Sequence, residues 1–97
     1  MSHPVTLVAQ LWIAPGRSEE FERFEAAASE VMARHGGMIE RRIALGSEAA
    51  AGSPDEVHVV TFPSRLAYEA YREDPAIAAL AELRARSIVR TVIWEGE

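Results

Sequence analysis

VHVVTFPS, residues 57–64, decides the fold, because it reads as a central β-strand that runs directly into a capped helix. Branched and aromatic side chains suit a pleated, packed surface, and Val57 to Phe62 consists of five such residues and one histidine. Both alternating sets of side chains are largely apolar, which favours an interior strand covered on both faces. Pro63 then removes a backbone donor from the ladder, and Ser64 is a favoured N-cap residue. The stretch predicts a strand that ends at Phe62 and a helix that follows Ser64.

A strand and a long helix are predicted before this stretch. Val5 to Ile13 alternates, and one of its two faces is wholly apolar and should meet the helices: Val5, Leu7, Ala9, Leu11 and Ile13. Pro15-Gly16 ends the strand, and Ser18 is the expected cap of an amphipathic helix whose apolar residues recur at spacings of three and four to about His35. Gly36-Gly37 ends that helix.

The rest of the chain predicts two more strands and a second helical region. Met38 to Leu45 reads as a strand, and the small, polar residues from Gly46 to Asp55 are typical of a long, mobile hairpin connection. The helix after the central strand extends to about Arg72. Asp74-Pro75, a cap followed by proline at the first helical position, starts another short helix. Ile88 to Glu95 closes the chain as a fourth strand.

The element order is therefore β-α-β-β-α-β within a single domain of residues 1–97, with the second helical region split at Asp74-Pro75. Right-handed crossovers turn this order into a four-stranded antiparallel sheet with helices on one face, the ferredoxin-like arrangement of the α+β class. The other sheet face, to which Val8 and Trp12 belong, would then expose an apolar patch on the order of several hundred Å². A homodimer that buries sheet against sheet is the expected solution.

Composition excludes several classes of protein. The chain has 97 residues, no cysteine, a net charge of -5 and basic residues that are all arginine. Nucleic-acid binding needs clustered positive charge, so we expect no nucleic-acid partner. The longest apolar run, Val5 to Ala14, is too short to cross a membrane and follows no basic segment, so we expect no membrane span, no secretory signal and a cytoplasmic protein. There is no thiolate, and the spacing of His3, His35 and His58 indicates no metal site.

The chain also resembles a known family. Phe62-Pro63-Ser64, the Asp74-Pro75 and Leu83-Arg84 pairs, and a last strand ending in Glu95-Gly96 are similar to the dimeric α/β-barrel superfamily. The likeness is to its small uncharacterised domains and to antibiotic-biosynthesis-monooxygenase-like proteins, and the Pro15-Gly16 turn fits the same pattern. This resemblance implies a ferredoxin-like subunit that forms a dimeric α/β barrel through its sheet face.

Two branches of that superfamily imply different chemistry. The functional Asn, Trp and His of the haem-degrading branch would fall near Ala9, Tyr71 and Ala81, and none of the three matches. The quinone-forming monooxygenase branch works without metal or flavin on a phenolic substrate in an apolar pocket, so it implies no cofactor and a small aromatic ligand. Aromatic residues could line such a pocket here: Trp12, Tyr68, Tyr71 and Trp94.

His58 is the titratable residue of most chemical interest. An imidazole on an otherwise apolar strand could serve as a base or a hydrogen-bond partner in a pocket, or could be a packed residue bonded to a neighbour. Gln10 and Trp12 are expected to share a sheet face with it. Gln10 would contact substrate or be a satisfied polar group at the dimer interface, and Trp12 would hold an aromatic ring or anchor the core or interface.

Three further residues are candidate substrate contacts. Tyr68 and Tyr71 lie three apart on one helix and flank a single side of it, so either hydroxyl could reach a cavity between helix and sheet. Arg42, like Arg84, could bind a substrate carboxylate or could pair with an acidic side chain on the surface or at an interface.

Two functional classes stay open. One is a cofactor-independent monooxygenase or isomerase that acts on a small aromatic or polyketide-like compound and uses no metal. In this class His58 is the catalytic residue, and the substrate contacts are Gln10, Trp12, Arg42, Tyr68 and Tyr71. The other is a non-catalytic small-molecule-binding or structural dimer. An enzyme needs a cavity on the order of a few hundred Å³ with convergent polar groups, whereas an interaction dimer can fill its interior completely.

Overall fold

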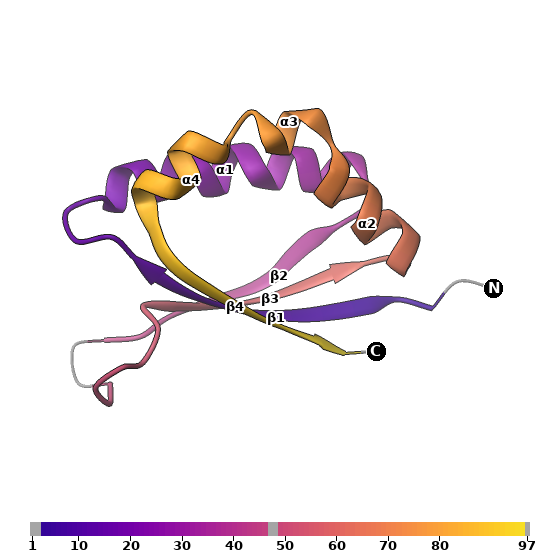
Figure 1. The fold of residues 1–97 in the computed structure, drawn as a ribbon. Coiled ribbons are helices and arrows are strands. Elements are labelled where there is room, and N and C mark those ends of the chain that lie inside the picture. Colours follow the sequence, from indigo (N-terminus) through magenta and orange to yellow (C-terminus); the bar gives the residue numbers. More distant parts are fainter. Residues whose placement is uncertain (1–2, 47–48, 97) are drawn as a thin grey trace.

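The helices lie together on one face of a four-stranded antiparallel sheet (Figure 1). A computed structural model describes residues 3–46 and 49–96. In chain order the elements are β1 (Val5–Ile13), α1 (Ser18–Arg34), β2 (Met38–Ala44), β3 (Glu56–Phe62), α2 (Arg65–Glu73), α3 (Pro75–Ala78), α4 (Ala81–Ser87) and β4 (Ile88–Gly96). The strand order is β2-β3-β1-β4, and all three pairings are antiparallel. The predicted α+β, ferredoxin-like arrangement is confirmed.

The capping residues around α2 behave as the sequence predicts. The Ser64 hydroxyl accepts a hydrogen bond from the Ala67 N–H at 3.1 Å and begins α2. Asp74 accepts from the Ala76 N–H at 2.8 Å, with Pro75 as the first residue of α3. These caps fix the direction in which the second helical region crosses the sheet.

Three local expectations differ from the structure or lie outside it. Ser18 is the first residue of α1 and not its cap; Arg17 holds that position without a side-chain cap. The helical region after Asp74 forms two helices, because the Leu80 N–H bonds the Ile77 carbonyl three residues back and the turn tightens there. The predicted hairpin connection includes residues 47–48, which lie outside the described ranges.

The core lies between the sheet and α1 and consists of two clusters of buried side chains. The first contains Val5, Leu7, Met32, Val60, Phe62 and Tyr68. The second contains Leu11, Phe21, Phe24, Ala28 and Ile88. Along β1 the clusters are separated by Ala9, which points to the same side as Leu7 and Leu11 but has too short a side chain to join them.

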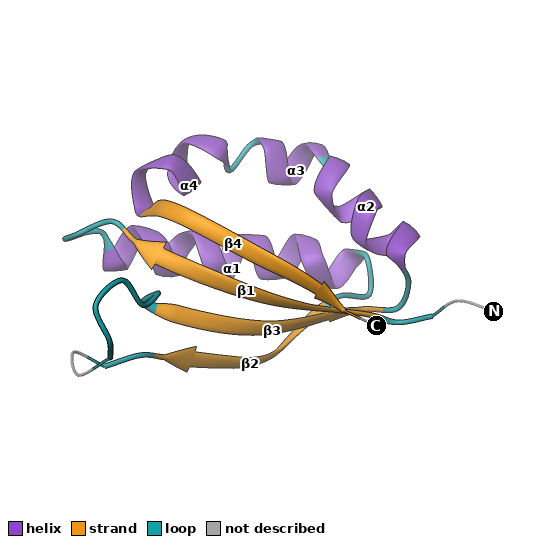
Figure 2. Ribbon diagram, turned by 60° about the horizontal axis from the view of Figure 1, so that its bottom comes forward, coloured by secondary structure: helices purple, strands orange, loops and turns teal. Residues whose placement is uncertain are grey.

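Among residues 3–46 and 49–96 no helix covers the opposite sheet face, and Figure 2 shows the strands in front of α1. β3 is interior in the sheet, between β1 and β2, but only its His58, Val60 and Phe62 side is buried; the predicted cover on both faces is therefore not provided within one chain. Large apolar side chains on the open face include Met38 and Trp94, which are 56% and 63% exposed. Within the described ranges, no helix combines the length and the apolar character needed to cross a membrane.

Candidate functional site

A cavity of about 300 Å³ lies between the sheet and the helices, where the two core clusters separate. Its lining is mostly apolar. Ala9 marks its floor: it is partly exposed although it lies on the inner face of a central strand, whereas Leu7 and Leu11 on either side are only 4% and 5% exposed. The polar side chains that line the cavity are Glu25, His58, Tyr68, Tyr71, Arg72, Arg84 and Thr91.

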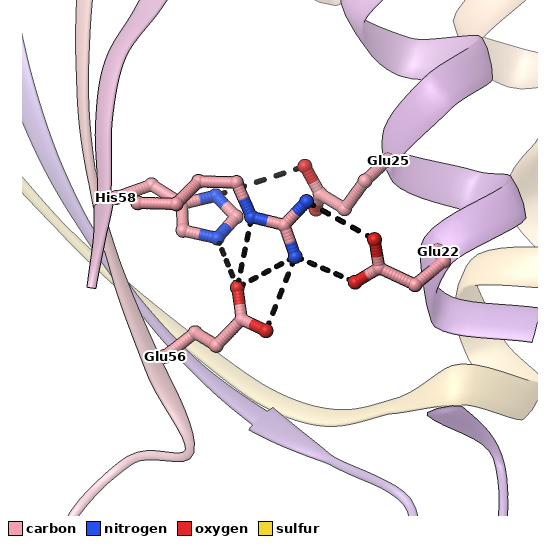
Figure 3. A network of polar contacts seen from close by, with 5 residues as sticks. Glu22, Glu25, Glu56 and His58 are labelled. Carbon is pink, nitrogen blue, oxygen red and sulfur yellow. Dashed lines mark hydrogen bonds and ion pairs between the residues drawn. The ribbon is translucent and has the colours of Figure 1, made fainter. Parts of the chain in front are cut away.

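Glu25 and His58 are buried, and Figure 3 shows their side chains next to each other in a polar network. His58 lies on β3 directly opposite Ala9 of β1, so the antiparallel register points its ring at the helices. Its Nε2 is 2.8 Å from Glu56 Oε1, and its Nδ1 is 3.6 Å from Glu25 Oε2. The imidazole therefore lies between two carboxylates, one from its own strand and one from α1.

Arg42 closes this network on its outer side. It lies opposite His58 on β2, and its Nη2 donates to Glu56 Oε1 at 2.8 Å and to Glu22 Oε1 at 2.6 Å. These hydrogen bonds raise the pKa of Arg42 above its ordinary value, with Glu22 the main cause, and the Arg42 hydrogen bond lowers the pKa of Glu22. Arg42 thus pairs with both Glu22 and Glu56, and Glu25 is the carboxylate without an arginine partner in the described network.

Glu25 has the electrostatic properties of a proton acceptor. Burial raises its pKa above the ordinary value, and the nearby His58 opposes this shift only in part. Because the Glu56 carboxylate accepts the hydrogen bond, the His58 nitrogen that faces it, Nε2, is the donor, and Nδ1 faces the Glu25 carboxylate. Such a pair can take a proton from a group in the cavity without creating a net buried charge on its own.

Aromatic side chains form another wall of the cavity. The Tyr68 and Tyr71 rings lie 5.3 and 5.2 Å from the Phe62 ring, between centroids, in tilted arrangements. Burial raises the pKa of Tyr71 to about 12, with Glu25 adding to the effect. Burial also raises the pKa of Tyr68. Both hydroxyls therefore stay protonated at neutral pH and can donate hydrogen bonds to a ligand.

The mouth of the cavity lies along the edge strand β4. Its exposed lining residues come from three elements: Arg72 from α2, Arg84 from α4 and Ile93 from β4. Arg84 Nη2 donates to Thr91 Oγ1 at 2.8 Å. Arg72 lies over the Tyr68 ring, 5.4 Å from its centroid. The cavity therefore has a buried acid–base pair at one end and two guanidinium groups at the other.

Residues 7–96 match the family described as Domain of unknown function (DUF1330). The chain belongs to this family. Comparison with curated proteins gave no match. The family match covers nearly all of the sheet and all the residues of the cavity, but assigns no activity to them.

Solved structures show the same fold as this DUF1330 domain. A protein of unknown function from Rhodopseudomonas palustris, RPA0582, has a TM-score of 0.82 at 15% identity over 99% of this chain and 82% of its own. SnoaB, a cofactor-independent oxygenase from Streptomyces nogalater, has a TM-score of 0.73 at 17% identity over 99% of this chain and 93% of its own. A dimeric ferredoxin-like protein of unknown function from Thermobifida fusca has a TM-score of 0.67 at 16% identity over 99% and 92%.

These likenesses confirm the resemblance that the sequence shows to ferredoxin-like proteins related to antibiotic-biosynthesis monooxygenases. At such low identities they show the fold alone. The chemistry of the DUF1330 cavity has to be argued from its own residues.

The structure brings some of the predicted site residues together and separates others. His58, Tyr68 and Tyr71 all line the cavity of the DUF1330 domain. Gln10 and Trp12 lie on the open sheet face, so the expectation that they share a face with His58 is wrong. The register pairs His58 with Ala9, so His58 points to the same face as Ala9 and away from the face of Gln10 and Trp12. Trp12 Nε1 donates to the Gly52 carbonyl at 3.2 Å.

Arg42 does not line the cavity, although it lies one strand away from it. Of the two alternatives for this residue, the structure shows pairing with acidic side chains, Glu22 and Glu56. Its guanidinium nitrogens Nε, Nη1 and Nη2 all donate to these carboxylates. Arg42 therefore fixes the position of Glu56, which in turn bonds His58.

Glu25 is the residue that sequence reasoning missed. The neighbouring acids Glu19, Glu20 and Glu22 suggest a solvated helix face, but Glu25 follows Phe21 by four residues and precedes Ala28 by three, which places it in the apolar stripe of α1. A carboxylate inside an apolar stripe is the signal that could have identified it. Within residues 3–46 and 49–96, no group of three or more acidic and histidine side chains is arranged to hold a metal ion.

Proposed function

We propose that this DUF1330 protein is an enzyme that removes a proton from a small aromatic compound bound between the sheet and the helices. The observation that supports this most is the buried Glu25–His58 pair at the end of an otherwise apolar cavity. A purely structural dimer has no need for an empty interior or for a carboxylate and an imidazole that line it.

The dimensions and the lining of the cavity favour a compound with one ring. About 300 Å³ is at the lower end of the range of small-molecule sites. Phe62, Tyr68 and Tyr71 offer aromatic surfaces at the offset distances in which rings pack on one another. Sugars and nucleotides would leave many polar groups unpaired against such a wall.

Glu25 is the group that would accept the proton, and His58 would share it. A base works best when its pKa lies near the operating pH, and burial moves the Glu25 pKa upward in that direction. His58 is held by Glu56 on one side, so its other nitrogen stays directed at Glu25. Tyr71 would donate a hydrogen bond to the oxygen on which negative charge develops.

The same proton transfer begins either of two reactions. An isomerase returns the proton to a different atom of the substrate, whereas a cofactor-independent monooxygenase lets the electron-rich anion react with dioxygen. The fold shared with SnoaB, which is described as a cofactor-independent oxygenase, supports the second reaction. A non-catalytic binding protein could use the same cavity. The Glu25–His58 pair favours an enzyme over that alternative.

We also propose that the protein forms a homodimer through its open sheet face. Met38 and Trp94 are more than half exposed on that face in one chain. Exposed apolar clusters of this kind mark association surfaces. The Thermobifida fusca protein with the same fold is described as dimeric. Because the cavity lies on the other side of the sheet, the dimer would leave its mouth open.

The test is a panel of phenols and aryl ketones with two readouts. Proton exchange is followed by NMR in D2O, and dioxygen consumption is followed with an electrode. We expect at least one compound to show activity in one readout, with Glu25→Gln reducing it by roughly 100-fold or more. Glu30→Gln, an exposed carboxylate on the same helix outside this polar network, is the matched control and should retain activity. If the wild type binds a compound but catalyses neither reaction, the protein is a binding protein and not an enzyme. If Glu25→Gln keeps full activity, Glu25 is not the base.

A further inference from the structure

We propose that the substrate is an aryl carboxylate, whose carboxylate group binds Arg84 and Arg72 at the mouth while its acidic O–H or C–H bond faces Glu25. This inference rests on the proposed function, because it assumes that the cavity holds the substrate. To the proposed function it adds that the substrate is an anion and that the aromatic end of the substrate enters the cavity first.

Arg72 and Arg84 are distinguished by their place in the lining of the cavity. Within the described residues, Arg17, Arg42, Arg65 and Arg86 each form an ion pair with a glutamate. Arg72 and Arg84 line the cavity and have no carboxylate within 4.0 Å in residues 3–46 and 49–96. Arg23, Arg34, Arg41 and Arg90 also form no ion pair within the described residues, but they do not line this cavity, so it is the position of Arg72 and Arg84 that makes them candidate ligand contacts.

Both guanidinium groups are oriented before any ligand binds. The Thr91 hydroxyl accepts one hydrogen bond from Arg84 at 2.8 Å, which uses one of its five N–H groups. The Arg72 guanidinium lies against the Tyr68 ring, which restricts its position without using its donors. Planar guanidinium groups with remaining donors are the side chains that bind carboxylates most specifically.

The acidic side chains near the mouth do not compete for these donors. Glu95 pairs with Arg65, which in turn lies 3.9 Å from Glu69. Glu25 is at the other end of the cavity, in contact with His58. A ligand carboxylate at the mouth is therefore attracted by Arg72 and Arg84, and the Glu25 carboxylate repels it from the buried end of the cavity.

This separation of charge also sets the orientation of the substrate. The anionic group stays at the exposed mouth, where it keeps part of its hydration, and the aromatic ring lies against the apolar lining. The group that loses its proton is the end that reaches Glu25. A compound with an acidic hydroxyl opposite its carboxylate, such as para-hydroxyphenylacetate, fits this pattern.

The experiment compares para-hydroxyphenylacetate with para-hydroxyphenylacetamide, its neutral analogue of the same shape, by isothermal titration calorimetry at millimolar ligand. We expect the acid to bind about tenfold or more tightly than the amide. Arg84→Gln and Arg72→Gln should each reduce that preference and leave amide binding unchanged. Arg86→Gln, an exposed arginine on the same helix as Arg84 that does not line the cavity, is the matched control.

The outcomes separate this inference from the proposed function. Equal affinity for acid and amide, unaffected by Arg84→Gln, would overturn the carboxylate assignment and leave the aromatic-binding cavity in place. No binding of either compound would overturn both. A preference for the acid that survives Arg84→Gln and Arg72→Gln but is lost in Arg86→Gln would place the anion elsewhere and contradict the assignment. Far-UV circular dichroism shows that each variant is folded.

Discussion

Replacing Ala9 by leucine tests whether the cavity is unfilled space that a ligand can occupy. Ala9 lies on the cavity floor between the buried Leu7 and Leu11. The substitution adds three carbon atoms, which at about 0.8 kcal/mol for each buried CH₂ would stabilise the protein by about 2.4 kcal/mol. Loss of leucine rotamer freedom, about 0.5–1 kcal/mol, reduces the gain to about 1.5–2 kcal/mol. A fully packed inner face would instead be overfilled, at a cost of about 1–3 kcal/mol.

The sign of the stability change is therefore the result to measure. Urea denaturation of Ala9→Leu should show a higher midpoint with an unchanged slope, because the native fold is kept. Calorimetry should show that para-hydroxyphenylacetate no longer binds, since the leucine occupies its place. Ala70→Leu, on the exposed side of α2, makes the same chemical change away from the cavity and should alter stability by no more than about 0.5 kcal/mol. Destabilisation of Ala9→Leu by about 1 kcal/mol or more, or ligand binding as in the wild type, would refute the reasoning.

Three further predictions concern the core, the buried acid and the open sheet face. A methyl group at Gly37 would lie 2.4 Å from the Phe62 ring, whereas one at Gly46 would have no neighbour within 4 Å. Gly37→Ala should therefore lower the unfolding free energy by about 1–3 kcal/mol, and Gly46→Ala should not. Equal urea midpoints for the two variants would contradict this. Burial raises the pKa of Glu25 above 4.5, so the folded state holds this proton more tightly, and the stability that it contributes below pH 4.5 is lost as pH rises through the raised pKa. Glu25→Gln should therefore gain stability relative to the wild type as the pH rises above 4.5 through the raised pKa, and a difference that does not change with pH above 4.5 would argue against a raised pKa. Trp94→Glu places a charge on the open face and should give a folded monomer by light scattering, whereas we expect a dimer for the wild type; a dimeric variant would show that association uses another surface.

Much of the fold could be predicted because its signals are local. The hydroxyl of Ser64 and the carboxylate of Asp74 bond backbone groups two or three residues away, so their caps can be read from the sequence around them. The alternation of β1 likewise identifies its helix-facing side without knowledge of the other strands. These features are enough to give the element order, and the element order gives the ferredoxin-like topology.

The site depends on contacts that are distant in the chain. The register that pairs His58 with Ala9 sets the sheet face on which His58 lies. A shift of this strand register by one residue would have placed His58 opposite Gln10, as the sequence suggested. Residue type alone was enough to indicate Tyr68 and Tyr71. Glu25 was obscured by the acidic residues before it on the same helix, although its position in the apolar stripe could have distinguished it.

The most direct test of the central claim is an NMR titration of methyl-labelled protein with para-hydroxyphenylacetate. Methyl groups report on one sheet face or the other, because alternate side chains of a strand point to opposite sides. We expect shifts and intermolecular NOEs at the methyl groups of Ala9 and Ile93, which line the cavity, with little change at Val8 and Ile43 on the open face. Shifts confined to Val8 and Ile43, or no shifts at millimolar ligand, would contradict the claim that the cavity is the binding site.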